Sequence, residues 1–114
     1  MNTTNTISWD DFEKVAMRVG TIIEATIFKE VKKPAYQLVI DFGVEIGLKK
    51  SSAQITKCYA VEELIGKQII AVVNFEKKQI GTFMSECLVL ASINDDEIIL
   101  LTSDKKVANG LKIG

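Results

Sequence analysis

The regular alternation of apolar and polar residues in two neighbouring segments most constrains the fold. In residues 35–42 (AYQLVIDF) every second position carries a large apolar or aromatic side chain, namely Tyr36, Leu38, Ile40 and Phe42. Because successive side chains of a β-strand point to opposite faces, this pattern predicts a strand with one buried face. Residues 17–28 (MRVGTIIEATIF) alternate in the same way, and the predicted inner face comprises Met17, Val19, Thr21, Ile23, Ala25 and Ile27. The interior Gly20 indicates a bulge or the sharp bend of a small barrel.

Further stretches also have the character of strands. Residues 47–55 follow a glycine-containing turn, and residues 67–75 (KQIIAVVNF) are almost continuously apolar, as in a central strand. Residues 86–93 and 97–103 predict a hairpin across the turn Asn94, Asp95 and Asp96.

Two short helical segments complete the pattern. Ser8 precedes Asp11 by three residues, as in a capping box, and predicts a helix that runs to about Val15. Residues 55–66 predict a second helical segment, between the third and fourth strands. Strands in this order predict an all-β protein with the OB-fold, a five-stranded and partly open Greek-key barrel.

Composition limits the classes of function. With 114 residues, the chain is expected to form one domain over residues 1–114. It contains no histidine, which excludes imidazole bases and most zinc sites, and Cys58 and Cys87 lack metal-ligand spacing. We therefore expect no catalytic residue, metal or cofactor. Without an apolar leader or a long apolar run, we expect a cytoplasmic protein with no membrane insertion.

Charge is unevenly distributed although the net charge is only −1. Residues 29–78 hold nine lysines against six acidic residues, whereas the segments on either side carry an acidic excess. This local basic excess favours an anionic partner. Arg18 is the single arginine, so a bound nucleic acid would be held through phosphates and shape more than through base edges.

Two polar and basic stretches are candidate nucleic-acid contacts. One comprises Asn74, Lys77, Lys78 and Gln79, and the other comprises Lys49, Lys50, Ser51, Ser52 and Gln54. Ammonium, hydroxyl and amide groups of this kind reach phosphate and ribose oxygens. The alternative is that both stretches are ordinary solvated turns with local hydrogen bonds.

Apolar side chains at the ends of predicted strands are candidate peptide contacts, namely Phe28, Phe75, Ile80, Phe83 and Met84. Such residues stack on bases or hold an apolar peptide, and the alternative is packing in the core. Phe83 and Met84 are adjacent, so in an extended segment they must point to opposite faces. One of the two is therefore expected at the surface or at an interface. Cys87 is expected to be a small core residue.

Four segments in order resemble the tRNA-binding domain family, and within it the CsaA-like export chaperones: DFEKVAMRVGTI, KKPAYQLVIDFG, KKSSAQIT and LIGKQIIAVVNFEKKQIGTFMSECLVLA. The resemblance covers about residues 10–112. It implies an OB-fold, a homodimer, tRNA contacts around residues 74–86 that include Ser85 and Glu86, and binding of unfolded export-bound polypeptides. It also implies dimer contacts at Trp9, Phe12, Asn109 and Gly110.

Some positions depart from the pattern of that subgroup. Glu76 and Lys77 stand where a proline pair is usual, and Thr82 and Ala108 also replace prolines. The loop keeps its positive charge but loses stiffness. We thus expect a non-catalytic homodimer, with two open alternatives for its ligand. It binds tRNA, holds unfolded preproteins as a chaperone that works with the export machinery, or does both. The alternative is a pure tRNA-binding module that assists aminoacylation or tRNA stability without a chaperone role.

Overall fold

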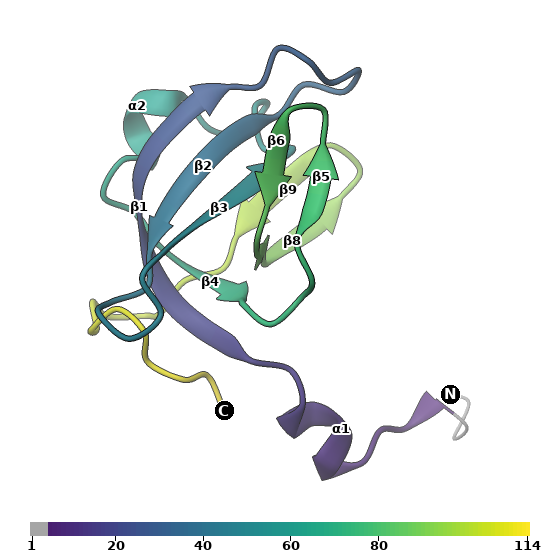
Figure 1. The fold of residues 1–114 in the computed structure, drawn as a ribbon, viewed down its shortest axis with the longest axis vertical. Helices are drawn as coiled ribbons and strands as arrows, with labels where there is room; N and C mark the ends of the chain where they lie inside the picture. The colour runs from purple at the N-terminus through teal and green to yellow at the C-terminus, as the bar shows by residue number, and fades with distance from the viewer. Residues whose placement is uncertain (1–4) are drawn as a thin grey trace.

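A five-stranded antiparallel sheet, curled into a barrel, forms the centre of the computed structural model, which describes residues 5–114 (Figure 1). Its strands, in the order β3-β2-β1-β4-β7, are β1 (Met17–Ile27), β2 (Tyr36–Asp41), β3 (Leu48–Ala53), β4 (Gln68–Val72) and β7 (Leu88–Val89). The edges β3 and β7 approach each other, and the Glu86 N–H next to β7 donates to the Lys50 carbonyl at 2.7 Å. The barrel is nearly closed, which confirms the predicted OB-fold.

Two hairpins and two short helices surround this barrel. The hairpins are β5 (Lys78–Ile80) with β6 (Phe83–Ser85), and β8 (Ala91–Asn94) with β9 (Glu97–Leu100). The helices are α1 (Trp9–Glu13) and α2 (Val61–Leu64). The predicted hairpin across residues 94–96 and the helix between β3 and β4 are confirmed, although α2 occupies only the last part of residues 55–66.

The β5–β6 hairpin differs from the sequence prediction, which treated residues 74–86 as a loop. Each strand has only three residues, too few for a period of two to be recognised. Gly81, at a φ of +61°, forms the turn between them.

The predicted inner face of β2 is confirmed, because Tyr36, Leu38, Ile40 and Phe42 are all buried. They pack in the main core with buried residues of β1, β4, β9 and α2, among them Ile22, Ile69, Leu100 and Leu64.

The predicted inner face of β1 is wrong at two positions. Ile27 shares a face with the buried Ala25 but is the last residue of β1 and is 64% exposed. At Ile23 the cause is a bulge, because the pairing with β2 shifts by one residue between Ile22 and Glu24, so Ile22 is fully buried while Ile23 is 40% exposed. A bulge of this kind exchanges the two faces of a strand. The bulge lies beyond Gly20, where a Cβ atom would approach Ile40 Cγ2 at 2.6 Å. Gly20 therefore makes room for the core residues of β2.

A second, smaller core lies beneath the β5–β6 hairpin. Phe28, Ala35 and Phe83 are buried there, and Val31 and Ile80 pack against them. The Phe28 and Phe83 rings are 5.4 Å apart at an interplanar angle of 58°, an arrangement typical of favourable aromatic pairs.

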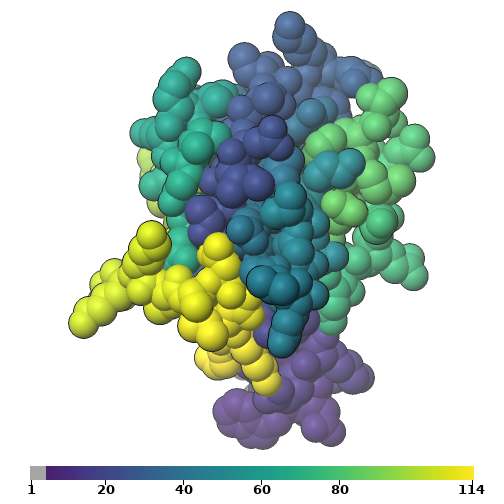
Figure 2. All heavy atoms as spheres, turned by 60° about the vertical axis from the view of Figure 1, so that its left-hand side comes forward, coloured from purple at the N-terminus to yellow at the C-terminus, as the bar shows by residue number. Residues whose placement is uncertain are grey.

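Helix α1 and the C-terminus both lie below the barrel in the view of Figure 1. In α1, Ser8 Oγ accepts from the Asp11 N–H at 3.0 Å and Asp11 Oδ2 accepts from the Ser8 N–H at 3.3 Å, which confirms the capping box. The C-terminal segment, yellow in Figure 2, runs along β1, where the Gly110 N–H donates to the Val19 carbonyl at 2.7 Å. Within residues 5–114, neither helix has the length and apolarity that a membrane crossing requires.

Candidate nucleic-acid interface

Four lysines lie along one edge of the barrel, where β3 meets the β5–β6 hairpin. Lys49 and Lys50 belong to β3, Lys78 begins β5 opposite Ser85 of β6, and Lys77 immediately precedes it. We call these four residues the lysine edge. The distant segments that carry them come together because β6 packs against β3.

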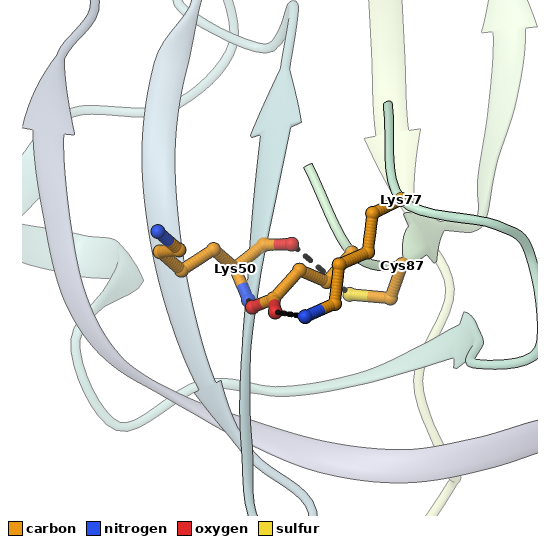
Figure 3. A network of polar contacts seen from close by, with 4 residues as sticks. Lys50, Lys77 and Cys87 are labelled. Atoms are coloured by element: carbon orange, nitrogen blue, oxygen red, sulfur yellow. Dashed lines mark hydrogen bonds and ion pairs between the residues drawn. The ribbon is translucent and has the colours of Figure 1, made fainter. Parts of the chain in front are cut away.

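Glu86 connects the two halves of the lysine edge. Its Oε1 accepts from the Lys50 N–H at 3.0 Å, and its Oε2 lies 3.4 Å from Lys77 Nζ (Figure 3). Burial by itself would raise the pKa of this carboxyl, but the Lys50 N–H and the Lys77 ammonium together lower the pKa below its ordinary value. Glu86 is thus a carboxylate at neutral pH.

Further contacts hold the β5–β6 hairpin in place. The Ser52 N–H donates to Ser85 Oγ at 3.4 Å, and at the tip Thr82 Oγ1 donates to Glu30 Oε1 at 2.8 Å. The hydrogen bond of Thr82 to Glu30 restrains the tip of the hairpin. Together with the small core, these contacts fix the backbone that carries Lys77 and Lys78.

Cys87 lies behind the lysine edge and is buried, as predicted. Burial raises the pKa of its thiol to about 12, and its Sγ lies 3.7 Å from the Lys50 carbonyl (Figure 3). A thiol in this state is not a nucleophile at neutral pH.

The structure brings most of the predicted nucleic-acid contacts to this surface. Gln54, Lys77, Lys78 and Gln79 are exposed, while five residues are half-buried, namely Lys49, Lys50, Ser52, Ser85 and Glu86. The prediction of Ser51 as a nucleic-acid contact is wrong, because Ser51 is 1% exposed. Its side chain faces the interior, between two half-buried neighbours. The alternation of β3 makes this unavoidable.

Asn74 makes two hydrogen bonds to distant backbone groups that the sequence did not predict. Its Oδ1 accepts from the Ala16 N–H at 3.0 Å and its Nδ2 donates to the Lys14 carbonyl at 2.7 Å. These bonds tie the segment after α1 to the end of β4. The partners are 58 and 60 residues away in the sequence, so no local signal could have identified them.

The apolar candidates separate into two groups. Phe28 and Phe83 are 2% and 8% exposed, so both belong to the small core and offer no accessible surface to a peptide, which corrects their assignment as peptide contacts. Met84 is half-buried on the opposite face of β6, which confirms that it and Phe83 point in different directions. Phe75 is 59% exposed and Ile80 is half-buried.

A hollow of about 220 Å³ lies beside the lysine edge. It is lined by Phe75, Glu76, Lys78, Ser85, Cys87 and Leu88. Leu88 is 48% exposed, and sequence reasoning missed it because it stands in an apolar run that predicts burial.

The residues expected at a dimer contact lie on α1 and on the C-terminal segment. Trp9 is 84% exposed and Phe12 is half-buried, whereas Asn109 and Gly110 make contacts within the chain. Asn109 Oδ1 accepts from Thr21 Oγ1 at 2.7 Å and from Gln68 Nε2 at 3.2 Å. Gly110 has a φ of +90°, and a Cβ atom there would lie 2.5 Å from the Phe42 carbonyl oxygen. Both residues fasten the C-terminal segment to the barrel.

In the part of the chain that the structure describes, no group of three His, Cys, Asp or Glu side chains converges as a metal site would require. The chemistry of the lysine edge is therefore that of ammonium groups, backbone N–H groups and one carboxylate.

Comparison with known proteins identifies the family of this chain and solved structures with the same fold. The family described as tRNA binding domain matches residues 17–112. A chaperone CsaA from Bacillus anthracis is 46% identical, with a TM-score of 0.91, and the match covers 96% of this chain and 99% of that one. A CsaA chaperone protein from Picrophilus torridus is 54% identical, with a TM-score of 0.90, over 96% of this chain and 100% of that one.

Enzymes that contain a similar segment also match. The methionine–tRNA ligase of Thermotoga maritima is 34% identical over 109 residues, which cover 96% of this chain but 17% of the ligase. The ligase of Parabacteroides distasonis is 32% identical over 110 residues, 94% of this chain and 16% of the ligase. The chain thus spans about a sixth of the length of these ligases.

Proposed function

We propose, from its membership of the tRNA-binding domain family and its CsaA-like members, that the chain binds tRNA through the lysine edge. In this proposal the protein is non-catalytic and cytoplasmic. The observation that supports this most directly is that β3, which carries Lys49 and Lys50, packs against the β5–β6 hairpin, whose first strand begins at Lys78 directly after Lys77.

The lysine edge binds phosphates in this proposal. Lysine ammonium groups neutralise the RNA backbone and release its counterions, which supplies affinity without reading sequence. In this proposal the hydroxyl groups of Ser52 and Ser85 and the exposed amide of Gln79 contact ribose and phosphate oxygens. Gln54 is also exposed, but it lines a separate hollow with Lys57 and Asp96. Phe75 is 59% exposed and lies beside Lys78, so it is the aromatic side chain next to the lysine edge that would stack on an unpaired base.

The binding unit is a homodimer in this proposal. Trp9 is 84% and Ile7 is 68% exposed on the segment around α1, and burying large apolar side chains of this kind favours association. Two lysine edges in one particle would contact separate stretches of one folded RNA, which strengthens binding through effective concentration.

A titration with total tRNA at several salt concentrations tests the proposal. We expect the logarithm of the binding constant to fall linearly with the logarithm of salt concentration, by about 0.7 to 0.9 for each phosphate contact. The double variant Lys77→Glu and Lys78→Glu should weaken binding at least about 10-fold and reduce this slope, because two phosphate contacts become repulsive.

The matched control is Lys105→Glu with Lys106→Glu. It makes the same change in charge on the C-terminal segment, which projects on the side of Figure 2 opposite the green β5–β6 segment. Equal losses in the two double variants would mean that tRNA responds to net charge alone. Unchanged affinity in the Lys77 and Lys78 variant would refute the site.

A second candidate function is the holding of unfolded preproteins for the export machinery. It is favoured by the relatives named as CsaA chaperones and by the hollow that Phe75 and Leu88 line next to Lys78. An unfolded precursor added as a competitor in the same titration distinguishes the two. Displacement of tRNA would show a shared surface, and precursor binding that survives high salt without tRNA binding would favour the chaperone function alone.

A further inference from the structure

Glu86 occupies the position in the lysine edge where an anionic ligand would be expected. Its carboxylate receives a hydrogen bond from the Lys50 N–H at 3.0 Å and lies 3.4 Å from Lys77 Nζ. A strand-edge N–H together with a lysine ammonium is the donor pair that proteins commonly present to a phosphate oxygen. In the free protein, both the Lys50 N–H and the Lys77 ammonium are already paired with the Glu86 carboxylate.

The two partners of the Lys77–Glu86 pair differ in accessibility. The Lys77 side chain is 65% exposed, whereas the Glu86 side chain is 18% exposed. A ligand can therefore reach the ammonium from solvent while the carboxylate stays close to β3, held by the Lys50 N–H. Ion pairs with one exposed partner are weak and exchange readily for another anion.

We propose that Glu86 is an intramolecular competitor for phosphate, and that RNA binding exchanges the Lys77–Glu86 pair for a Lys77–phosphate pair. This inference rests on the proposed function for its ligand. It makes Glu86 a specificity-determining residue. A single monovalent anion gains little over the carboxylate already present, whereas a polyanion such as RNA contacts several lysines at once and compensates for the lost pair.

Glu76 provides a matched control for this assignment. It lies on the same segment, one residue before Lys77, and lines the hollow next to Lys78. Within the described residues it is exposed and has no ion pair. Glu76→Gln and Glu86→Gln therefore remove the same charge from the same surface, and only the second releases Lys77. Glutamine at position 86 keeps an oxygen that can accept from the Lys50 N–H.

The test compares tRNA affinities at low salt. We expect Glu86→Gln to raise affinity about 3- to 5-fold, the scale of one exposed ion pair, and Glu76→Gln to raise it less than about 2-fold. In a Lys77→Ala background the gain from Glu86→Gln should fall to that of Glu76→Gln. Equal gains from the two variants in the wild-type background, or weaker binding by Glu86→Gln, would overturn the proposal. Thermal unfolding verifies that each variant is folded.

A second measurement separates this inference from the proposed function. The Glu86 carboxyl ¹³C resonance, assigned by its loss in Glu86→Gln, is followed while inorganic tripolyphosphate is added to the wild type. We expect it to shift as the anion takes Lys77, and the shift should be absent in Lys77→Ala. If tRNA fails to bind but tripolyphosphate causes this shift, the proposed function is refuted. Replacement of the Lys77–Glu86 pair by a Lys77–phosphate pair is then still supported. If tRNA binds and the resonance does not move with either anion, the exchange is refuted.

Discussion

The two hairpins that flank the barrel have similar geometry and opposite character. β5–β6 is preceded by Lys77, packs on the small core and is hydrogen-bonded to β3. β8–β9 has an acidic turn at Asp95 and Asp96 and contributes Leu100 to the main core. The β5–β6 hairpin therefore carries charged side chains above the small core, and the β8–β9 hairpin contributes to the main core. This difference indicates that one hairpin presents ligand-binding groups while the other contributes mainly to stability.

The largest expected effect concerns β9. Leu100→Ala removes a side chain that is 9% exposed in the main core, so we expect the free energy of unfolding to fall by about 3 kcal/mol. Affinity for tRNA should stay within about 2-fold, because the lysine edge lies on the other hairpin. Urea unfolding and tRNA titration of the same preparation measure both quantities. A large loss of affinity in the folded variant would show that the hairpins are coupled.

The complementary change in β6 should affect both properties. Phe83→Ala removes one ring of the Phe28–Phe83 pair, and we expect a loss of about 2 kcal/mol, less than at Leu100, because the small core can open locally. Affinity for tRNA should fall about 5- to 10-fold, since Lys77 and Lys78 then lose their fixed support.

Hydrogen exchange of the β5 amides, together with the tRNA titration, measures this change. The control for the exchange measurement alone is Phe75→Ala, which truncates a phenylalanine that is 59% exposed and should change stability by less than about 0.5 kcal/mol. Unchanged exchange and affinity in Phe83→Ala would mean that the hairpin does not depend on its small core.

The smallest expected effect is a pH dependence at Cys87, which follows β6. Its folded-state pKa of about 12 lies above the ordinary value of about 8.5, so the contribution to stability is complete below pH 8.5 and is lost as pH rises towards 12. Between pH 8.5 and 9.5 we expect the free energy of unfolding to fall by about 1 kcal/mol. Cys87→Ala should remove that part of the slope, and an unchanged slope would contradict the assignment.

Local patterns were sufficient for much of the fold. The alternation of β2 predicted its buried face, Ser8 and Asp11 predicted the capping box, and residues 94–96 predicted the turn of β8–β9. Each of these features depends on residues within a few positions of one another. The lysine-bearing stretches around Lys49 and Lys77 could be identified for the same reason, from residue type and spacing alone.

Contacts between distant segments decided the rest. The bulge after Ile22, the pairing of Glu86 with Lys50 and Lys77, and the bonds of Asn74 to Lys14 and Ala16 connect parts of the chain that a sequence window does not compare. Burial of Ser51 likewise follows from the packing of β3 in the barrel and not from its residue type. The sequence alone therefore determined which segments form strands and which carry charge, because those properties are local. Only the tertiary structure determined which charges meet, because that depends on strand register and on the closure of the barrel.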